Sequence, residues 1–179
     1  MLGFILTSCE SKKDQTINMI NAFFDQEIAE LNQTTDLKSF YEFDSISNDA
    51  FTDFEDKLDN MCDPKMDFIG MNAEEDSIVW DVFNKRVDDW YNLYSQKQKE
   101  YYEPLFSELE SAYNELDNLV EEYGGDVETV PDELYDPLYD NFMEKLNQNK
   151  KYWSVFDENQ FARLIEMFGN EEDLEFYMN

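Results

Sequence analysis

Histidine is absent from the 179-residue sequence, and cysteine occurs only at Cys9 and Cys62. Without histidine, the chain lacks the commonest general base and the usual partner of a serine or cysteine nucleophile. Two cysteines alone supply neither the usual zinc ligand set nor a disulfide framework. No phosphate-binding loop and no calcium-loop spacing occur either. We therefore expect a protein that is not an enzyme and has no catalytic residue, cofactor or metal site.

Basic residues and long apolar runs are also scarce. The chain has 13 Lys and Arg against 43 Asp and Glu, so its formal net charge is −30 at pH 7. Nucleic acids and anionic membranes are bound through Lys and Arg, so this composition disfavours direct binding to either. No run reaches the length of a membrane-spanning helix. The sequence thus predicts a protein of the host-cell cytoplasm whose partners are basic proteins or cations.

Apolar residues are nevertheless abundant and make up 42% of the sequence, and many of them are aromatic. They recur at spacings of three and four residues, which places them on one face of a helix. Strand alternation occurs nowhere over a useful length. We therefore predict an all-α fold, a helical bundle of about five to seven helices with two long central ones. Residues 15–179 are expected to form a single acidic helical domain after an N-terminal segment, residues 1–14, that consists of an apolar stretch and a polar spacer.

Capping residues and helix breakers predict where these helices begin and end. N-caps are expected at Thr35, Asn48, Asn72, Asp136 and Asp157, with Pro137 in a first helical position and Gln160 completing a capping box. Pro104 is expected to break or kink the helical pattern, because proline has no backbone N–H to donate. Gly124 and Gly125 are expected to end the helix that follows, through a left-handed backbone conformation.

The first nine residues are apolar and end in Leu6-Thr7-Ser8-Cys9, before a polar stretch. This segment resembles the lipobox of bacterial lipoprotein precursors, in which small residues precede a cysteine that becomes lipidated. The resemblance implies lipidation at Cys9 and a lipid anchor in the bacterial cell envelope, with a helical binding or immunity domain attached. Unlike a secretory signal, the segment has no basic residue before its apolar stretch. The alternative is that the apolar side chains of the segment pack into the core, namely Leu2, Phe4, Ile5 and Leu6.

Acidic residues are concentrated between positions 100 and 144, where fifteen Asp and Glu occur without any Lys or Arg. A helix shaped only by stability interleaves Lys with Glu, because opposite charges four residues apart stabilise it. The alternative interpretation is an ordinary solvated helix face. In charge and size the chain is similar to the nucleic-acid-mimic inhibitors of phages and mobile elements. This resemblance implies an anti-defence protein that occupies the basic groove of a nuclease or another nucleic-acid-processing enzyme.

The partner-binding residues predicted on this basis are mostly acids of that block. Two tyrosines are added because they fall outside the apolar seam of their helix, and exposed tyrosine suits protein interfaces. The full set is Glu103, Glu108, Glu110, Glu115, Asp117, Glu121, Glu122, Asp126, Glu128, Asp132, Glu133, Asp136, Tyr91 and Tyr102.

Overall fold

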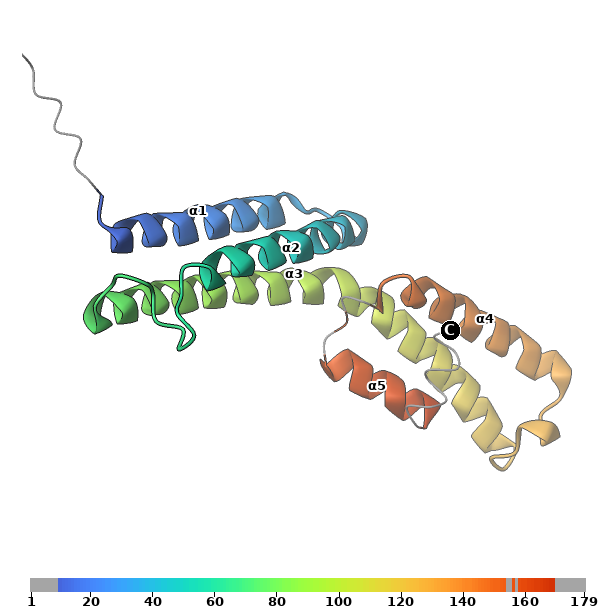
Figure 1. Ribbon diagram of the computed structural model, residues 1–179. Helices are drawn as coiled ribbons and strands as arrows, with labels where there is room; N and C mark the ends of the chain where they lie inside the picture. The colour runs from blue at the N-terminus through green and yellow to red at the C-terminus, as the bar shows by residue number, and fades with distance from the viewer. Residues whose placement is uncertain (1–9, 154–155, 157, 170–179) are drawn as a thin grey trace, which may run out of the picture. The chain divides into compact units, whose positions relative to one another are not determined.

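The computed structural model describes residues 10–153, 156 and 158–169, and this part of the chain is all-α (Figure 1). The predicted fold class is therefore confirmed. Its β structure, within the described residues, is one isolated bridge between Cys62 and Phe68. The elements are α1 (Lys12–Gln33), α2 (Leu37–Asp59), α3 (Ala73–Glu122), the 3-10 turn η1 (Val127–Thr129), α4 (Asp132–Lys150) and α5 (Glu158–Phe168).

Helix α3 is one continuous element of 50 residues. Of the two outcomes predicted at Pro104, the break is wrong, because the helix continues through this residue. The kink stays a prediction. Proline removes one backbone hydrogen bond, but Pro104 and the residue four positions earlier, Glu100, are both exposed, so water can reach the carbonyl group that loses its partner. Tyr102 and Phe106, which flank the proline, are fully buried and hold the helix by packing.

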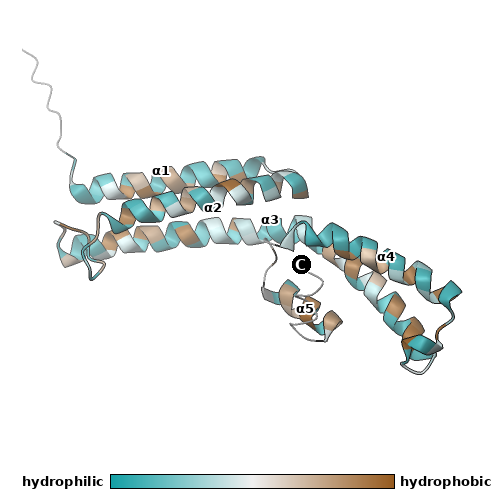
Figure 2. Ribbon diagram, turned by 45° about the vertical axis from the view of Figure 1, so that its right-hand side comes forward, coloured by the Kyte–Doolittle hydropathy of each residue, from teal (hydrophilic) through white to brown (hydrophobic). Residues whose placement is uncertain are grey.

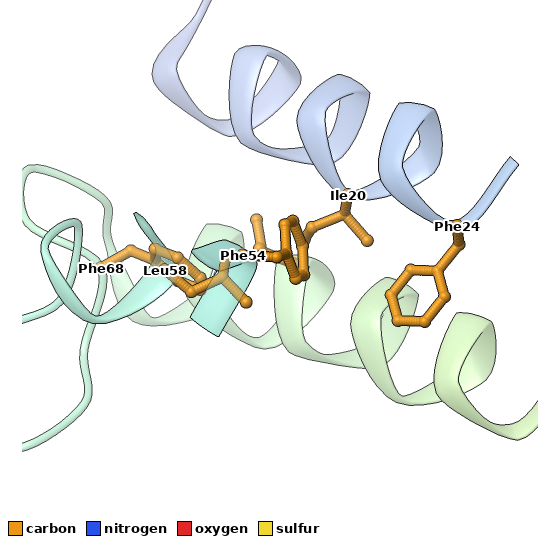
Figure 3. Close-up of a cluster of buried hydrophobic side chains, with 6 residues drawn as sticks. Ile20, Phe24, Phe54, Leu58 and Phe68 are labelled. Atoms are coloured by element: carbon orange, nitrogen blue, oxygen red, sulfur yellow. The ribbon is translucent and has the colours of Figure 1, made fainter. Parts of the chain in front are cut away.

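The described chain divides into two compact units, one ending at Lys97 and the other beginning at Gln98, and α3 contributes residues to both. The prediction of one domain over residues 15–179 stays a prediction. In the first unit, α1 and α2 pack side by side against the N-terminal half of α3 (Figures 1 and 2). Figure 3 shows the centre of its core, to which α1 contributes Ile20 and Phe24 and α2 contributes Phe54 and Leu58.

The start of α2 differs from the prediction. Its N-cap is Asp36, whose side chain accepts a hydrogen bond from the Ser39 backbone N–H at 2.8 Å, and the Ser39 hydroxyl lies 3.2 Å from the Asp36 backbone N–H in return. Thr35 and Asn48 are therefore not N-caps, and Asn48 lies inside α2. The predicted cap of α3 is confirmed, because Asn72 accepts from the backbone N–H groups of Glu74 and Glu75.

In the second unit, α4 and α5 flank the C-terminal half of α3 (Figure 1). Helix α4 begins at Asp132, directly after Pro131, so the predicted start at Asp136 and Pro137 is wrong and Pro137 lies within the helix. Pro131 fixes the extended backbone just before the helix and leaves Asp132 and Glu133 in its first turn, where acids favour the helix dipole. The predicted cap at Asp157 lies outside the described residues.

Candidate functional site

Three of the predicted partner-binding acids already have cationic partners within the fold. Lys145 of α4 contacts Glu108 of α3 at 2.6 Å. Arg163 of α5 binds both Glu103 and Glu110, with 3.1 Å between its Nη1 and Glu103 Oε1. The middle of the acidic block is thus partly neutralised by cations from other helices, and it is not a continuous anionic ridge.

The other nine predicted acids are all exposed and surround one turn. They lie on the last turns of α3, on η1 and its N-cap, and on the first turns of α4. All 13 Lys and Arg belong to the described residues, and none of them forms an ion pair with these nine carboxylates. We call this surface the acidic tip: Glu115, Asp117, Glu121, Glu122, Asp126, Glu128, Asp132, Glu133 and Asp136.

The turn that carries the acidic tip is built by specific backbone interactions. Gly124 and Gly125 adopt the predicted left-handed conformation, with φ of 89° and 78°, and this ends α3. The Thr129 hydroxyl lies 2.8 Å from the carbonyl oxygen of Tyr123 and 2.7 Å from that of Asp126, which ties the two ends of the turn together. Val130 is buried and fastens the turn to the core. The carboxylates therefore project from an ordered support.

The charges at the C-terminus of α3 oppose the stability of the helix. The carbonyl end of a helix carries partial negative charge, so cations stabilise it and anions destabilise it. The last turn of α3 nevertheless contains Glu121 and Glu122 and no basic residue. Stability alone would favour lysine at these positions, which indicates that another requirement accounts for the acids.

The two predicted tyrosines differ in exposure. Tyr91 is 61% exposed, as expected, and it belongs to the first unit. Tyr102 is fully buried, so its predicted availability to a partner is wrong. Its ring packs edge-on against Tyr152 and Phe156, with centroids 5.7 and 5.8 Å away. The face of α3 that is buried changes along the helix, because α3 packs against α1 and α2 in the first unit and against α4 and α5 in the second.

Two buried carboxyl groups were missed by the sequence analysis. Glu27 of α1 is 3% exposed and accepts a hydrogen bond from the Ser47 hydroxyl. Asp44 of α2 accepts one from the Tyr94 hydroxyl. Removal from water raises the pKa of both groups above the ordinary value, and these hydrogen bonds offset part of the rise. Glu27 shares a helix face with Phe24 and Leu31, and that spacing was the available signal.

A pocket in the first unit has a volume of about 330 Å³. Its only titratable lining residue is Lys12, whose ammonium group donates to the carbonyl of Ile69 at 3.2 Å. The rest of the lining is polar or apolar without a nucleophile or general base: Gln15, Thr16, Asn60, Met61, Phe68, Ile69 and Met71. The cavity presents no catalytic arrangement.

Among the described residues, no three metal-binding side chains come together, and no helix is long and apolar enough to cross a bilayer. Cys9 and the lipobox-like segment lie outside the described residues. Comparison of the chain with protein-family models, curated proteins and solved structures gives no match. The two resemblances noted in the sequence stay predictions.

Proposed function

We propose that the chain is a non-enzymatic acidic helical protein whose acidic tip binds a basic surface of a partner protein. The partner class is a nuclease or another nucleic-acid-processing enzyme, including a host defence enzyme, which the protein inhibits as a nucleic-acid mimic in the cytoplasm. The observation that carries the proposal is the set of nine exposed carboxylates gathered around one turn without an ion-paired cation.

Charge density supports this partner class. Duplex DNA carries one phosphate per ~3.4 Å along each strand, whereas acids spaced seven residues apart on one helix lie ~10 Å apart. A single helical row is therefore too sparse to imitate a strand. The acidic tip adds acids from η1 and α4 to those of α3, which brings the spacing of negative charges closer to that of phosphates.

The charge of the acidic tip also favours fast association with a basic partner. Complementary charge raises association rates by about 10- to 1,000-fold at low salt, and salt screens this effect beyond ~10 Å. We therefore expect rapid binding to basic proteins that weakens as salt is added.

The test uses a panel of basic endonucleases and DNA-binding proteins, with the tightest binder kept as the probe. A tip-charge variant replaces four acids by amides: Glu115→Gln, Glu121→Gln, Glu122→Gln and Glu133→Gln. A matched control makes the same change in charge on exposed positions of α2: Asp49→Asn, Asp53→Asn, Glu55→Gln and Asp56→Asn. Association rates are measured by surface plasmon resonance in 0.05 and 0.5 M NaCl.

The tip-charge variant is expected to associate at least about tenfold more slowly than the control in low salt. The wild-type protein is expected to block the probe's binding to DNA at a one-to-one ratio. Equal rates for the two variants, or no binding of the wild-type chain to any basic protein in the panel, would rule the proposal out.

As an alternative, we propose an envelope lipoprotein anchored through Cys9. One observation favours it: Met66 and Ile69, which are both exposed, lie in the loop that contacts Lys12 at the start of α1, close in sequence to Cys9. A membrane surface would cover such side chains in a lipid-anchored protein. In-frame DNA upstream of Met1 that encodes basic and apolar residues, together with fatty-acid labelling lost in Cys9→Ser, would support it. A stop codon directly upstream would exclude it.

A further inference from the structure

Three large apolar side chains are exposed in or beside the turn that carries the acidic tip. Tyr123 and Val127 lie between α3 and α4, and Leu134 lies in the first turn of α4. Tyr123 is 38% exposed, Val127 47% and Leu134 45%. Among the described residues from Gln98 onward, these are the large apolar side chains that the fold leaves exposed. Unit two thus places its exposed apolar side chains on a twelve-residue segment, residues 123–134, that also carries four of the nine unpaired acids: Asp126, Glu128, Asp132 and Glu133. The other five lie on either side of this segment in the sequence.

The exposure of these side chains is fixed by the ordered turn. Val130 is buried, whereas Val127, only three residues earlier and in the same turn, is not. Two hydrogen bonds hold Tyr123 and Val127 in position. The Thr129 hydroxyl donates to the carbonyl oxygen of Tyr123, and the Val130 backbone N–H donates to the carbonyl oxygen of Val127. A connecting turn needs no apolar side chains for its own geometry, and apolar residues held exposed together are typical of binding surfaces.

We propose that Tyr123, Val127 and Leu134 are the apolar anchors of a protein interface, and that the partner presents an apolar pocket inside a basic surface. This inference rests on the proposed function and specifies how the same surface is recognised. Acids adjoin every anchor in the sequence, namely Glu122, Asp126, Glu128 and Glu133. An apolar centre within a charged rim is the usual anatomy of a protein interface, and the central residues carry most of the affinity.

Charge complementarity selects a basic protein over a second copy of the chain. Two copies would bring two acidic tips together within a protein of net charge −30, and like charges at close range oppose association. Nucleic acid is disfavoured for the same reason. A basic protein neutralises the rim and covers the anchors, so the complex gains a part of its affinity that salt does not screen.

This mode of binding separates the effects of charge and apolar contact. The rim governs the association rate, whereas the anchors govern the dissociation rate and the binding that survives in high salt. The tip-apolar variant carries Tyr123→Gln, Val127→Thr and Leu134→Gln and keeps every acid. Its matched control changes exposed apolar residues of the first unit: Ile46→Gln, Ile69→Gln and Ile78→Gln.

The experiment uses the same basic-protein probe as the test of the proposed function. We expect the tip-apolar variant to associate within about twofold of wild type in low salt, but to dissociate at least about tenfold faster and to lose binding in 0.5 M NaCl. The single variant Val127→Thr, which preserves side-chain shape, should show a smaller shift in the same direction. Circular dichroism checks that each variant is folded.

The outcomes distinguish the two proposals. If the tip-apolar and Val127→Thr proteins both dissociate at the wild-type rate and still bind in high salt, the proposal of apolar anchors is overturned. Slow association of the tip-charge variant would then still support binding through the acidic tip. Wild-type association of the tip-charge variant would overturn both. A wild-type dimer in sedimentation that dissociates in the tip-apolar variant would identify a second copy as the occupant and also overturn this inference.

Discussion

Arg163 of α5 binds Glu110 of α3 through two parallel hydrogen bonds. Its Nε lies 2.7 Å from one carboxylate oxygen, and its Nη2 donates to the other. The same guanidinium group contacts Glu103 and lies over the ring of Phe106, 4.4 Å from the centroid. These carboxylates raise the pKa of Arg163 above its ordinary value. One cation thus joins α5 to α3 and removes two acids from the surface available to a partner.

Replacing Arg163 with Met is expected to destabilise the protein by about 1–3 kcal/mol, because two half-buried carboxylates lose their counter-ion. The Arg163 side chain is 32% exposed, so water screens part of the interaction and the lower half of that range is expected. Arg163→Lys keeps the charge but loses the two-point geometry, and it should be intermediate. Urea unfolding measures all three proteins. Equal stability of wild type and Arg163→Met would show that the pairing contributes nothing.

Helix α2 provides a direct comparison of the predicted and observed caps. Asp36→Ala is expected to cost about 1 kcal/mol, because it removes the acceptor of the Ser39 backbone N–H. Thr35→Ala and Asn48→Ala should each change stability by less than about 0.5 kcal/mol, since neither residue is an N-cap. Thermal or urea unfolding of the three variants shows whether Asp36, Thr35 or Asn48 caps the helix. A larger loss in Asn48→Ala than in Asp36→Ala would contradict the observed helix start.

The sequence predicted the helices well, because the spacing of apolar residues records which face is buried. Ile20 and Phe24, four residues apart, are both buried, and so are Leu109 and Ala112, three residues apart, as the predicted helical spacing requires. The starts of α2 and α4 were misplaced because several residues near each start could serve as a cap. The error at Pro104 has another cause, since tertiary packing outweighs the local signal there. Pro104 lies on an exposed face of a helix held by packing, and such support is invisible in a sequence.

The buried carboxyl groups make stability depend on pH. Because burial raises the folded-state pKa of Glu27 and Asp44, the folded protein holds more protons than the unfolded chain above their ordinary values of 4.5 and 3.8. Their contribution to stability is therefore greatest below those values, and it is lost as pH rises through the folded-state pKa. Lower repulsion among the many acids acts in the same direction.

Glu27→Gln and Asp44→Asn are expected to stabilise the protein at pH 7, because each amide oxygen still accepts the hydrogen bond from Ser47 or Tyr94 without a buried charge. The gain should shrink as pH falls, because the raised pKa values make the wild-type carboxyls take up protons at a higher pH than ordinary carboxyls do. Glu55→Gln, on an exposed position, is the control for the loss of one negative charge. Urea unfolding at pH 7, 5.5 and 4 measures the effect, and a gain in Glu55→Gln that matches those in the two buried variants would refute the assignment.

The candidate site could be predicted in part. Charge composition identified the acidic block, since a run of acids without a base is visible in the sequence alone. The pairing of Glu108 with Lys145 was not foreseeable, because the two residues are 37 positions apart and meet only when α4 packs on α3. The same reason explains why burial of Tyr102 was missed: the rings that pack against it belong to Tyr152 and Phe156, about 50 positions later in the sequence.

Gly124 offers a test of whether the turn must be rigid for the acidic tip to function. Its φ of 89° is unfavourable for any residue with a Cβ atom, yet an added Cβ would meet no atom within 4 Å. Gly124→Ala should therefore cost about 1–2 kcal/mol through backbone strain alone, and Gly124→Asn less, because asparagine tolerates this conformation. Urea unfolding gives the cost. If the ordered turn holds Tyr123 and Val127 in place, Gly124→Ala should also speed dissociation from the basic probe while all nine carboxylates remain. Unchanged dissociation despite the loss of stability would mean that the acidic tip binds without a rigid turn.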